Sequence, residues 1–338
     1  MFVNKQWYVA ATSEELSHNL FQRWLLNKPY AFYRTNGGDP VVFDDRCPHR
    51  RFSLSKGTLS GDVLTCGYHG LSFGPQGNCV RIPGQEKIPP QIRARKLPAV
   101  DKYGLVWVWL GDEDQADETL IPDFHWMEKD GWTVNRGYRE MACNYQLLVD
   151  NLLDLTHETF VHKATIGHAE LAEVPIEARR DEDTVHVDRI VRNCDPPPLF
   201  SQCVNFSGKV DRYQLIRFKA PSFVWIDARA VDTGSNDFSN GLRWEVMNLI
   251  TPATTEKLHY FWGVSRAFGY GDDQTTEKIQ KAIEQTFDED QTILEEQHKL
   301  LKLDGPHDLM MAVHNDRGVT LARRMVNERI EHENGVHA

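Results

Sequence analysis

Two pairs of residues in the first third of the chain have the types and spacing of a metal site. A Cys-x-His pair, Cys47 and His49, is followed by a Cys-x-x-His pair, Cys66 and His69, and sixteen residues separate the two pairs. Thiolates and imidazoles both bind metals, and Pro48 and Gly67 mark the two segments as turns. The sequence therefore predicts that these two loops converge on one metal centre.

Three interpretations of this quartet compete. Two thiolates and two imidazoles suit a tetrahedral Zn²⁺ ion, and they also suit a Rieske [2Fe–2S] centre, in which two His replace two Cys on one iron. The third interpretation is a pair of buried Cys with incidental His. The spacing favours the Rieske centre, because zinc sites usually place Cys close to Cys and His close to His, whereas here each Cys is paired with a His.

A second group of candidate ligands comprises Asp154, His157 and His162. Asp154 and His157 lie three residues apart and would share one face of a helix, whereas His162 would point about 140° away from His157 on a regular helix. Both imidazoles can reach one ion only if the helix ends or bends between them, and Gly167 favours an ending. Without a third ligand, a surface or core role for the two His is the commoner explanation.

The third ligand is predicted on a helix over residues 275–303. An apolar stripe runs along this helix in steps of four and three, and it comprises Ile279, Ile283, Phe287, Leu294, Gln297 and Leu301 with Asp290 in its line. A buried carboxylate needs a cation or an Arg partner, so Asp290 is a candidate ligand, whereas Asp288 and Glu289 lie off the stripe and are expected to be solvated. Two His and one carboxylate form the facial triad of non-haem Fe(II) oxygenases.

The elements that would hold these residues fall into two domains. Residues 7–110 contain short apolar runs separated by Gly, Pro, Asn and Asp, which indicates an antiparallel β domain. Residues 145–163 have helical spacing, and residues 185–262 return to strand-like runs before the long helix. We expect an all-β domain over 1–115 and an α+β domain over 116–338, with the acidic stretch at 111–120 as a linker or surface excursion.

Composition excludes several classes of protein. The chain has 338 residues, of which 41% are hydrophobic and 26% charged, with a formal net charge of −11. This composition is typical of a globular protein and gives no basic footprint for nucleic acid. No run of about eighteen apolar residues could span a membrane, and the N-terminus lacks a signal-peptide pattern, so we expect a cytoplasmic protein without a membrane partner.

Several segments resemble one superfamily, the Rieske non-haem iron oxygenases, and within it the oxygenase components of vanillate and dicamba O-demethylases and toluenesulfonate methyl-monooxygenase. These segments are NKQWYVA at 4–10, CPHR at 47–50, CGYHGLSF at 66–73, IPGQ at 82–85, YGLVWVWLGD at 103–112 and DNLLDLTHETFVH at 150–162. The chain departs from the common pattern at residues 51–53, which affects the packing of the loop and no ligand.

The resemblance implies a fold and a set of cofactors. The N-terminal domain would be an all-β Rieske domain, and the C-terminal domain a helix-grip-like antiparallel sheet with helices. Cys47 and Cys66 would bind the inner iron of the [2Fe–2S] cluster, and His49 and His69 the outer iron. A mononuclear iron would be bound in the second domain, and the resemblance assigns its ligands as His157, His162 and Asp290.

The resemblance also implies an assembly. In this family an aspartate at the position of Asp154 joins a Rieske His of one subunit to an iron-binding His of the next. Here it would join His69 of one chain to His157 of its neighbour in a homotrimer, and Asn151 matches a family position near the iron. Asp154 and Asn151 are therefore the candidate catalytic residues beyond the ligands.

The implied reaction is an O₂-dependent monooxygenation. Electrons would pass from NAD(P)H through a separate flavin and iron–sulfur reductase to the Rieske cluster and then to the iron. The chain has no GxGxxG fingerprint, so flavin and nicotinamide are expected on the reductase, and the acidic surface of the chain is expected to help select it. The leading function is O-demethylation of a small, vanillate-like methoxylated aromatic acid to a phenol and formaldehyde.

Alternatives to this function are kept open. The same iron could hydroxylate a methyl group or ring of another aromatic acid or sulfonate. Two other classes are a Rieske electron carrier without catalytic iron and a zinc-stabilised binding module. The substrate's acid group needs a cation or donor, and the candidates on strand-like runs are Arg217, Arg243 and His259, although each is more commonly structural.

Overall fold

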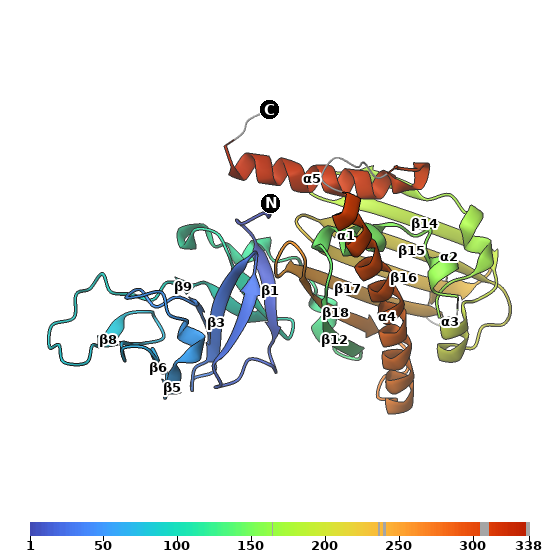
Figure 1. Cartoon of the computed structure of the whole chain (residues 1–338). Coiled ribbons are helices and arrows are strands. Elements are labelled where there is room, and N and C mark those ends of the chain that lie inside the picture. Colours follow the sequence, from blue (N-terminus) through green and yellow to red (C-terminus); the bar gives the residue numbers. More distant parts are fainter. Residues whose placement is uncertain (164, 236, 239–240, 305–310, 336–338) are drawn as a thin grey trace. The chain divides into compact units, whose positions relative to one another are not determined.

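The computed structural model describes residues 1–163, 165–235, 237–238, 241–304 and 311–335. The chain divides into two compact units (Figure 1). The first comprises residues 2–122 with 251–255, and the second comprises residue 1 with 123–250 and 256–338.

Three antiparallel sheets form the first unit. The first sheet has the strand order β1 (Trp7–Thr12), β11 (Leu105–Trp109) and β10 (Ala99–Lys102). The second has the order β2 (Phe21–Leu25), β3 (Lys28–Arg34), β4 (Pro40–Asp44) and β9 (Lys96–Leu97). The third has the order β5 (Thr58–Ser60), β6 (Val63–Thr65), β7 (Ser72–Phe73) and β8 (Cys79–Arg81). A short 3₁₀ helix, Leu54–Lys56, precedes β5. The all-β prediction for this region is confirmed.

Both candidate Cys of the first unit lie in its core. An apolar cluster between the second and third sheets contains Cys47 and Cys66 together with Leu64, Leu71 and Phe73. Cys47 comes shortly after β4 and Cys66 comes directly after β6. Two strand ends on different sheets therefore present the two loops that carry the Cys-His pairs.

The predicted division at residues 115 and 116 falls inside the first unit, which extends to Pro122. The acidic stretch forms two 3₁₀ turns, Glu113–Gln115 and Glu118–Leu120. The indole N–H of Trp7 donates to the carbonyl oxygen of Asp117 at 2.8 Å and so attaches the stretch to β1. The acidic composition of this segment predicted that it is exposed, but no local pattern indicated its contact with Trp7.

The second unit is built on one antiparallel sheet of seven strands. The strand order is β12 (Thr133–Met141), β18 (Leu258–Arg266), β17 (Leu242–Pro252), β16 (Phe223–Asp232), β15 (Val210–Lys219), β14 (Val185–Cys194) and β13 (Glu177–Arg180). Side chains along each strand alternate between the two faces of the sheet. Alternate residues of a strand therefore face the helix side of the sheet, and the residues between them face the opposite side.

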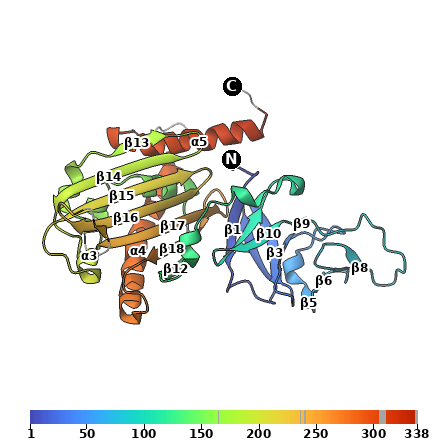
Figure 2. The same ribbon diagram turned by 180° about the vertical axis from the view of Figure 1, so that it is seen from behind.

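One long helix, α4 (Asp273–Asp304), covers one face of this sheet. It lies in front of the strands in Figure 1 and behind them in Figure 2. The other helices are α1 (Tyr145–Leu153), α2 (Glu158–Val161), α3 (Pro198–Cys203) and α5 (Arg317–Glu333). Short 3₁₀ helices span His125–Glu128, Ala169–Glu173 and His314–Asp316.

The structure confirms the predicted long helix and the strand-rich region before it, and the α+β class of this unit. Strands β12 and β13 and helix α5 were not predicted from the sequence. Strands β12 and β13 are rich in polar and charged residues and show no clear apolar period. Helix α5 does have such a period, because Ala322, Met325, Val326 and Ile330 are buried at helical spacing. No helix in the described ranges is both long and apolar enough to cross a membrane.

Candidate metal centres and substrate cavity

The Cys-His quartet forms a compact group in the first unit. Cys47 and Cys66 are each 2% exposed, and their thiols face one another. His49 and His69 are exposed, and their ring centroids lie 4.6 Å apart. Two buried sulfur donors and two exposed nitrogen donors match the ligand set of a Rieske [2Fe–2S] cluster, so the four residues fit that cofactor.

Tight turns hold the two sulfurs in place. The backbone N–H of Arg51 donates to the carbonyl oxygen of Cys47 at 2.8 Å, and that of Gly70 donates to the carbonyl oxygen of Cys66 at 3.0 Å. Gly70 has a φ of +72°, a conformation that a glycine adopts without strain. Burial raises the pKa of Cys47 to about 11, although backbone N–H groups of His49 and Arg50 oppose the shift. A bound metal ion would favour the thiolate form, which is the form that binds it.

The unusual residues at 51–53 belong to the first loop and include none of the four proposed ligands. The carbonyl oxygen of Phe52 accepts from the backbone N–H of Cys47 at 2.8 Å. The Phe52 ring lies 5.8 Å from the ring of Tyr68 on the second loop. Phe52, which departs from the common family pattern, therefore links the two loops through an aromatic contact.

His157, His162 and Asp290 come together in the second unit. The Nε2 atoms of the two His lie 3.1 Å apart, and Asp290 Oδ1 lies 3.2 Å from His162 Nε2 and 3.6 Å from His157 Nε2. One donor atom from each of the three residues lies within 4.8 Å of the other two, so the three side chains could hold one metal ion. Two nitrogens and one carboxylate oxygen fit a non-haem iron with open positions.

The helix that carries the two His is interrupted, as the spacing required. Helix α1 ends at Leu153, His157 is the residue that precedes α2, and His162 is the residue that follows it. The backbone N–H of Gly167 donates to the carbonyl oxygen of His162 at 2.8 Å, and a side chain at Gly167 would come within 2.2 Å of the Glu158 carbonyl oxygen. A single helical turn between two breaks therefore turns both imidazoles toward Asp290.

Each imidazole is oriented by a partner at its other nitrogen. His157 Nδ1 donates to the backbone carbonyl of Asp154, and His162 Nδ1 donates to Glu289 Oε2 at 2.8 Å. Each Nε2 is then left as the ligand atom, which is the usual arrangement at metal sites. The expectation that Glu289 is merely solvated is therefore wrong, because its side chain holds a buried His.

Electrostatics at the triad suit a cation. His162 is 1% exposed and Asp290 4% exposed. Burial lowers the pKa of His162, but Asp290 and Glu289 outweigh it and raise the pKa overall. The sequence predicts that a buried carboxylate at position 290 pairs with a metal ion or with an Arg. Asp290 pairs with two imidazoles and not with an Arg.

The two candidate catalytic residues flank the triad differently. Asn151 Nδ2 donates to Asp290 Oδ1 at 3.1 Å. The Asp154 carboxylate accepts from the backbone N–H of Thr156 at 2.8 Å and from its hydroxyl at 2.5 Å. Within the chain, Asp154 therefore contacts His157 through its backbone carbonyl, and its carboxylate is held toward Thr156.

A buried ionic cluster anchors the turn between the two His. Glu158 accepts from Arg189 at 2.6 Å, from Arg212 at 3.1 Å and from Gln214 at 2.5 Å. Arg189 also donates to the carbonyl oxygen of Leu155 at 2.8 Å. Burial raises the pKa of Glu158, but Arg212 and Arg189 outweigh it and hold the pKa below its usual range. No local sequence pattern indicated this cluster, because its members come from three elements.

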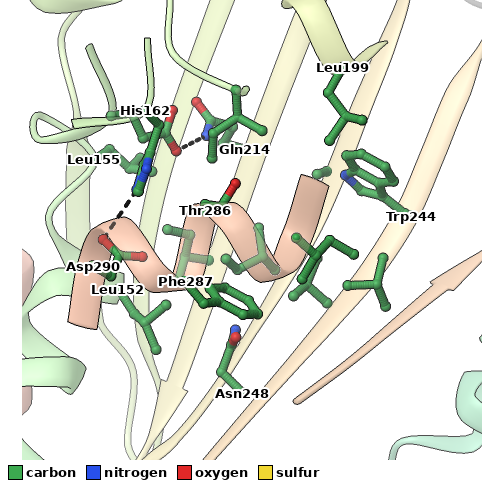
Figure 3. A pocket seen from close by; sticks show the side chains of 18 of the residues that line it. Leu152, Leu155, His162, Leu199, Gln214, Trp244, Asn248, Thr286, Phe287 and Asp290 are labelled. Carbon is green, nitrogen blue, oxygen red and sulfur yellow. Dashed lines mark hydrogen bonds and ion pairs between the residues drawn. The ribbon is translucent and has the colours of Figure 1, made fainter. Parts of the chain in front are cut away.

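The triad opens onto a mostly apolar cavity between α4 and the sheet (Figure 3). Its volume is about 120 Å³, close to the roughly 150 Å³ of an engineered cavity that binds benzene. Figure 3 shows Leu199, Trp244 and Phe287 around it, with His162 and Asp290 at one end. The cavity therefore suits one aromatic ring.

The three substrate-binding candidates lie on the other face of the sheet. On β15 the cavity is lined by Arg212, Gln214 and Ile216, so Arg217 points away from it. Arg217 pairs with Asp188 at 2.5 Å, Arg243 pairs with Glu245 at 2.8 Å and His259 Nδ1 contacts the Tyr138 hydroxyl at 2.9 Å. The sequence showed these strands without showing which face is covered, and a shift of one residue reverses the face.

Asn248 on β17 is a further polar residue on the cavity face that the sequence patterns did not indicate. It is fully buried, and its Oδ1 accepts from the Tyr260 hydroxyl at 2.6 Å. Its Nδ2 has no hydrogen-bond partner among the described residues. An unpaired buried donor is costly, so a ligand acceptor would satisfy it.

Comparison with known proteins agrees with this geometry. The Rieske [2Fe-2S] domain model matches residues 6–100, and the vanillate O-demethylase oxygenase C-terminal domain model matches residues 141–332. The chain is 35% identical to the iron–sulfur subunit of the toluene-4-sulfonate monooxygenase system of Comamonas testosteroni, over 99% of both chains. The chain belongs to the vanillate O-demethylase oxygenase family of Rieske non-haem iron oxygenases.

Other relatives extend the comparison. The oxygenase is 34% identical to a vanillate O-demethylase oxygenase subunit of Pseudomonas sp. (strain HR199 / DSM 7063), over 97% of this chain and 94% of that one. Its structure matches dicamba monooxygenase bound to dicamba with a TM-score of 0.90 and 30% identity, over 99% of both chains. A further structure of dicamba monooxygenase contains non-haem iron. The predicted fold class, oxidoreductase class and cofactors, a [2Fe–2S] cluster and a non-haem iron, are confirmed.

Proposed function

We propose that this oxygenase removes the methyl group from a small methoxylated aromatic acid of the vanillate type, forming a phenol and formaldehyde. The observation that carries the proposal is the His157, His162 and Asp290 triad at the end of an apolar cavity for one ring. Relatives that are named for vanillate O-demethylation support the choice of reaction.

Charge at the cavity wall supports an anionic substrate. Glu158 pairs with two Arg, Arg189 and Arg212, and the Asp154 carboxylate acts on Arg189 as well. Arg212 is 2% exposed and lines the cavity. A carboxylate or sulfonate of the substrate would pair with this guanidinium in the low-dielectric site. Asn248 offers a neutral donor on β17 to the same ligand.

The proposed reaction balances with NAD(P)H as reductant. One atom of O₂ enters a C–H bond of the methoxy group and the other leaves as water, while NAD(P)H is oxidised. The hydroxylated methyl group is a hemiacetal, whose C–O bond breaks to give formaldehyde as the hydroxyl proton passes to the phenolic oxygen. Iron bound at the triad supplies the O₂ activation. The chain supplies the dry apolar cavity and the groups that orient the ring.

Partners and assembly are part of this proposal. We assign Cys47, His49, Cys66 and His69 to the Rieske cluster and the triad to the mononuclear iron. We also propose a separate NAD(P)H-dependent flavin and iron–sulfur reductase, as expected for a chain whose relatives are named as oxygenase subunits. A homotrimer in which Asp154 joins His157 to His69 of a neighbouring chain completes the proposed electron path.

A single-turnover assay tests the function without the reductase. The protein with both metal centres loaded is reduced with dithionite, freed of excess reductant and mixed with O₂ and vanillate. We expect formaldehyde and 3,4-dihydroxybenzoate in equal amounts. The control His157→Ala should keep the visible absorption of the cluster and form neither product.

Two outcomes would contradict O-demethylation. No formaldehyde from a panel of methoxybenzoates, with iron present at the triad, would exclude the proposed substrate class. Conversion of 4-toluenesulfonate to its benzylic alcohol, together with inert methoxybenzoates, would establish methyl hydroxylation in its place.

A further inference from the structure

Trp244 on β17 presents a hydrogen-bond donor to the substrate cavity. Its side chain is 5% exposed, and among the described residues its indole N–H has no acceptor. Figure 3 shows the indole nitrogen on the side of the ring that faces the cavity. Buried Trp N–H groups usually have a partner, and an unpaired donor is costly. An acceptor on a ligand would therefore satisfy this group.

Neighbouring side chains hold the indole and leave space beside it. The Phe200 ring on α3 packs edge-on against it, with ring centroids 5.2 Å apart, and the Phe268 ring lies 6.2 Å away. The residue paired with Trp244 on β16 is Ala228, which also lines the cavity. Because the alanine side chain is small, it leaves room for a substituent of the ligand next to the indole. The donor is therefore fixed in position beside an open space.

A cation borders the same aromatic ring. The guanidinium carbon of Arg212 lies 5.3 Å from the centroid of the Phe200 ring, against which Trp244 also packs. The Nε atom of Arg212 has no hydrogen-bond partner within the described part of the chain. Trp244 and Arg212 are thus both neighbours of Phe200, and both carry an unpaired N–H donor. This combination suits a ligand group that accepts hydrogen bonds and carries a negative charge.

Asn248 supplies a further unpaired donor, its Nδ2, on the same strand as Trp244. The two residues are four positions apart, so both side chains face the cavity, and a rise of about 3.3 Å per residue separates their Cα atoms by about 13 Å. One substituent cannot contact both donors across this distance. A ring with oxygen substituents at two para positions can contact both, one at each end.

We propose that Trp244 fixes the position of the substrate's acid group, with its indole N–H donating to one carboxylate oxygen while Arg212 compensates the charge. Asn248 then donates to an oxygen substituent para to the acid group, and the methoxy group next to that oxygen faces the triad. This inference rests on the proposed function. It narrows the substrate class to 3-methoxybenzoates that carry an oxygen substituent at carbon 4.

The same arrangement disfavours an acid whose methoxy group is ortho to the carboxylate. In Figure 3, Trp244 and Leu199 lie on the side of the cavity opposite His162 and Asp290. When the carboxylate is bound at Trp244, an ortho methoxy group stays on that side of the ring, away from the triad. We therefore expect 3-methoxybenzoate to be demethylated faster than 2-methoxybenzoate.

Binding of two probes tests the role of Trp244 without turnover. The probes are vanillate and guaiacol, which is vanillate without its carboxylate, and each is titrated calorimetrically into the oxidised, metal-loaded oxygenase in the absence of a reductant. Wild type should bind vanillate about tenfold or more tightly than guaiacol, because only vanillate satisfies the donors beside Phe200. Trp244→Phe removes the N–H and keeps an aromatic ring, so it should weaken vanillate about tenfold and leave guaiacol binding unchanged.

Trp225→Phe is the matched control. Trp225 lies on β16, where the cavity is lined by Ile226 and Ala228, so its side chain faces the other side of the sheet. There it contacts Phe124, with ring centroids 6.2 Å apart. This variant should bind both probes like wild type, and both variants should keep their iron content.

Several outcomes separate the proposal from its alternatives. Equal losses for vanillate and guaiacol in Trp244→Phe would overturn it, since the indole would then act through packing alone. Equal affinity of wild type for the two probes, or faster single-turnover demethylation of 2-methoxybenzoate than of 3-methoxybenzoate, would also overturn it without any variant. Absence of formaldehyde from vanillate, with the expected binding pattern intact, would instead overturn the proposed reaction and leave the assignment of Trp244 standing.

Discussion

His162 depends on a residue outside the ligand set. Its Nδ1 donates to Glu289, which leaves Nε2 to face His157 and Asp290. The period of α4 singled out Asp290 as a buried acid, but it placed Glu289 off the apolar stripe. The three ligands could be predicted because their spacing in the sequence is unusual. The role of Glu289 could not be predicted, because it depends on the break after α2, which brings His162 beside Glu289.

Removal of this partner should weaken iron binding. Glu289→Ala leaves His162 Nδ1 without its acceptor, so we expect iron affinity to fall about 10- to 100-fold. Glu289→Gln keeps an oxygen acceptor and should recover part of the loss. Iron retained against a chelator measures the effect. Asp288→Ala, on the exposed neighbour that pairs with Arg139, is the matched control and should retain iron like wild type.

Asn248 is the residue we expect to orient the substrate. Asn248→Leu removes the unpaired Nδ2 donor but keeps most of the side-chain volume, so kcat/KM for vanillate should fall about tenfold. The loss should lie mainly in KM, with iron content unchanged. Tyr260→Phe, which frees the Asn248 amide to rotate, should give a smaller loss. Unchanged kinetics in Asn248→Leu would remove it from the substrate site.

At the scale of elements, the turn from His157 to His162 is held by charge. Glu158 lies within α2, and it is contacted by Arg189 on β14 and by Arg212 and Gln214 on β15. The sequence predicted that the helix must break, since two His five residues apart cannot otherwise meet. It could not predict the ionic cluster, because pairing between strands is not visible in a local pattern.

Neutralising Glu158 should destabilise the unit. Glu158→Gln leaves two buried Arg without their anion, which costs about 3–5 kcal/mol for a broken buried pair. Denaturant unfolding followed by tryptophan fluorescence measures the loss. Glu277→Gln, at an exposed pair with Lys281 on α4, should leave the midpoint unchanged. A stable Glu158→Gln variant would show that the cluster is not what holds the turn.

Glu158 should also make the stability of the folded protein depend on pH. The pKa of Glu158 is held below its ordinary value of 4.5 in the folded protein. A lowered pKa contributes stability above the ordinary value, and this stability is lost as the pH falls below it through the folded value. Wild type should therefore lose stability more steeply below pH 4.5 than Glu158→Gln does. Parallel acid-unfolding curves for the two proteins would contradict this assignment.

At the scale of the whole molecule, the chain contains two centres on separate compact units. Two motifs predicted the two centres separately, and the resemblance to one superfamily joined them in a single enzyme. The arrangement of one unit against the other was not predictable, because no local pattern in the sequence records contacts between distant segments.

The proposed trimer makes Asp154 part of the electron path. Asp154→Asn should slow transfer from the cluster to the iron while both metals and the oligomer are retained, because the path needs the carboxylate between His157 and the neighbouring chain's His69. Rapid-mixing absorption of the reduced cluster with O₂ and substrate measures the rate. Thr156→Val, which removes only the hydroxyl contact to Asp154, should have a smaller effect. An unchanged rate in Asp154→Asn would exclude the bridge.

The position of the iron, held by His157, His162 and Asp290 beside the substrate cavity, can be measured by anomalous diffraction. Crystals of the anaerobically purified oxygenase would be measured on both sides of the iron edge. We expect one peak within bonding distance of all three side chains and a second peak among Cys47, Cys66, His49 and His69. Zinc at the quartet, or an iron-loaded protein with no iron peak at the triad, would contradict this assignment.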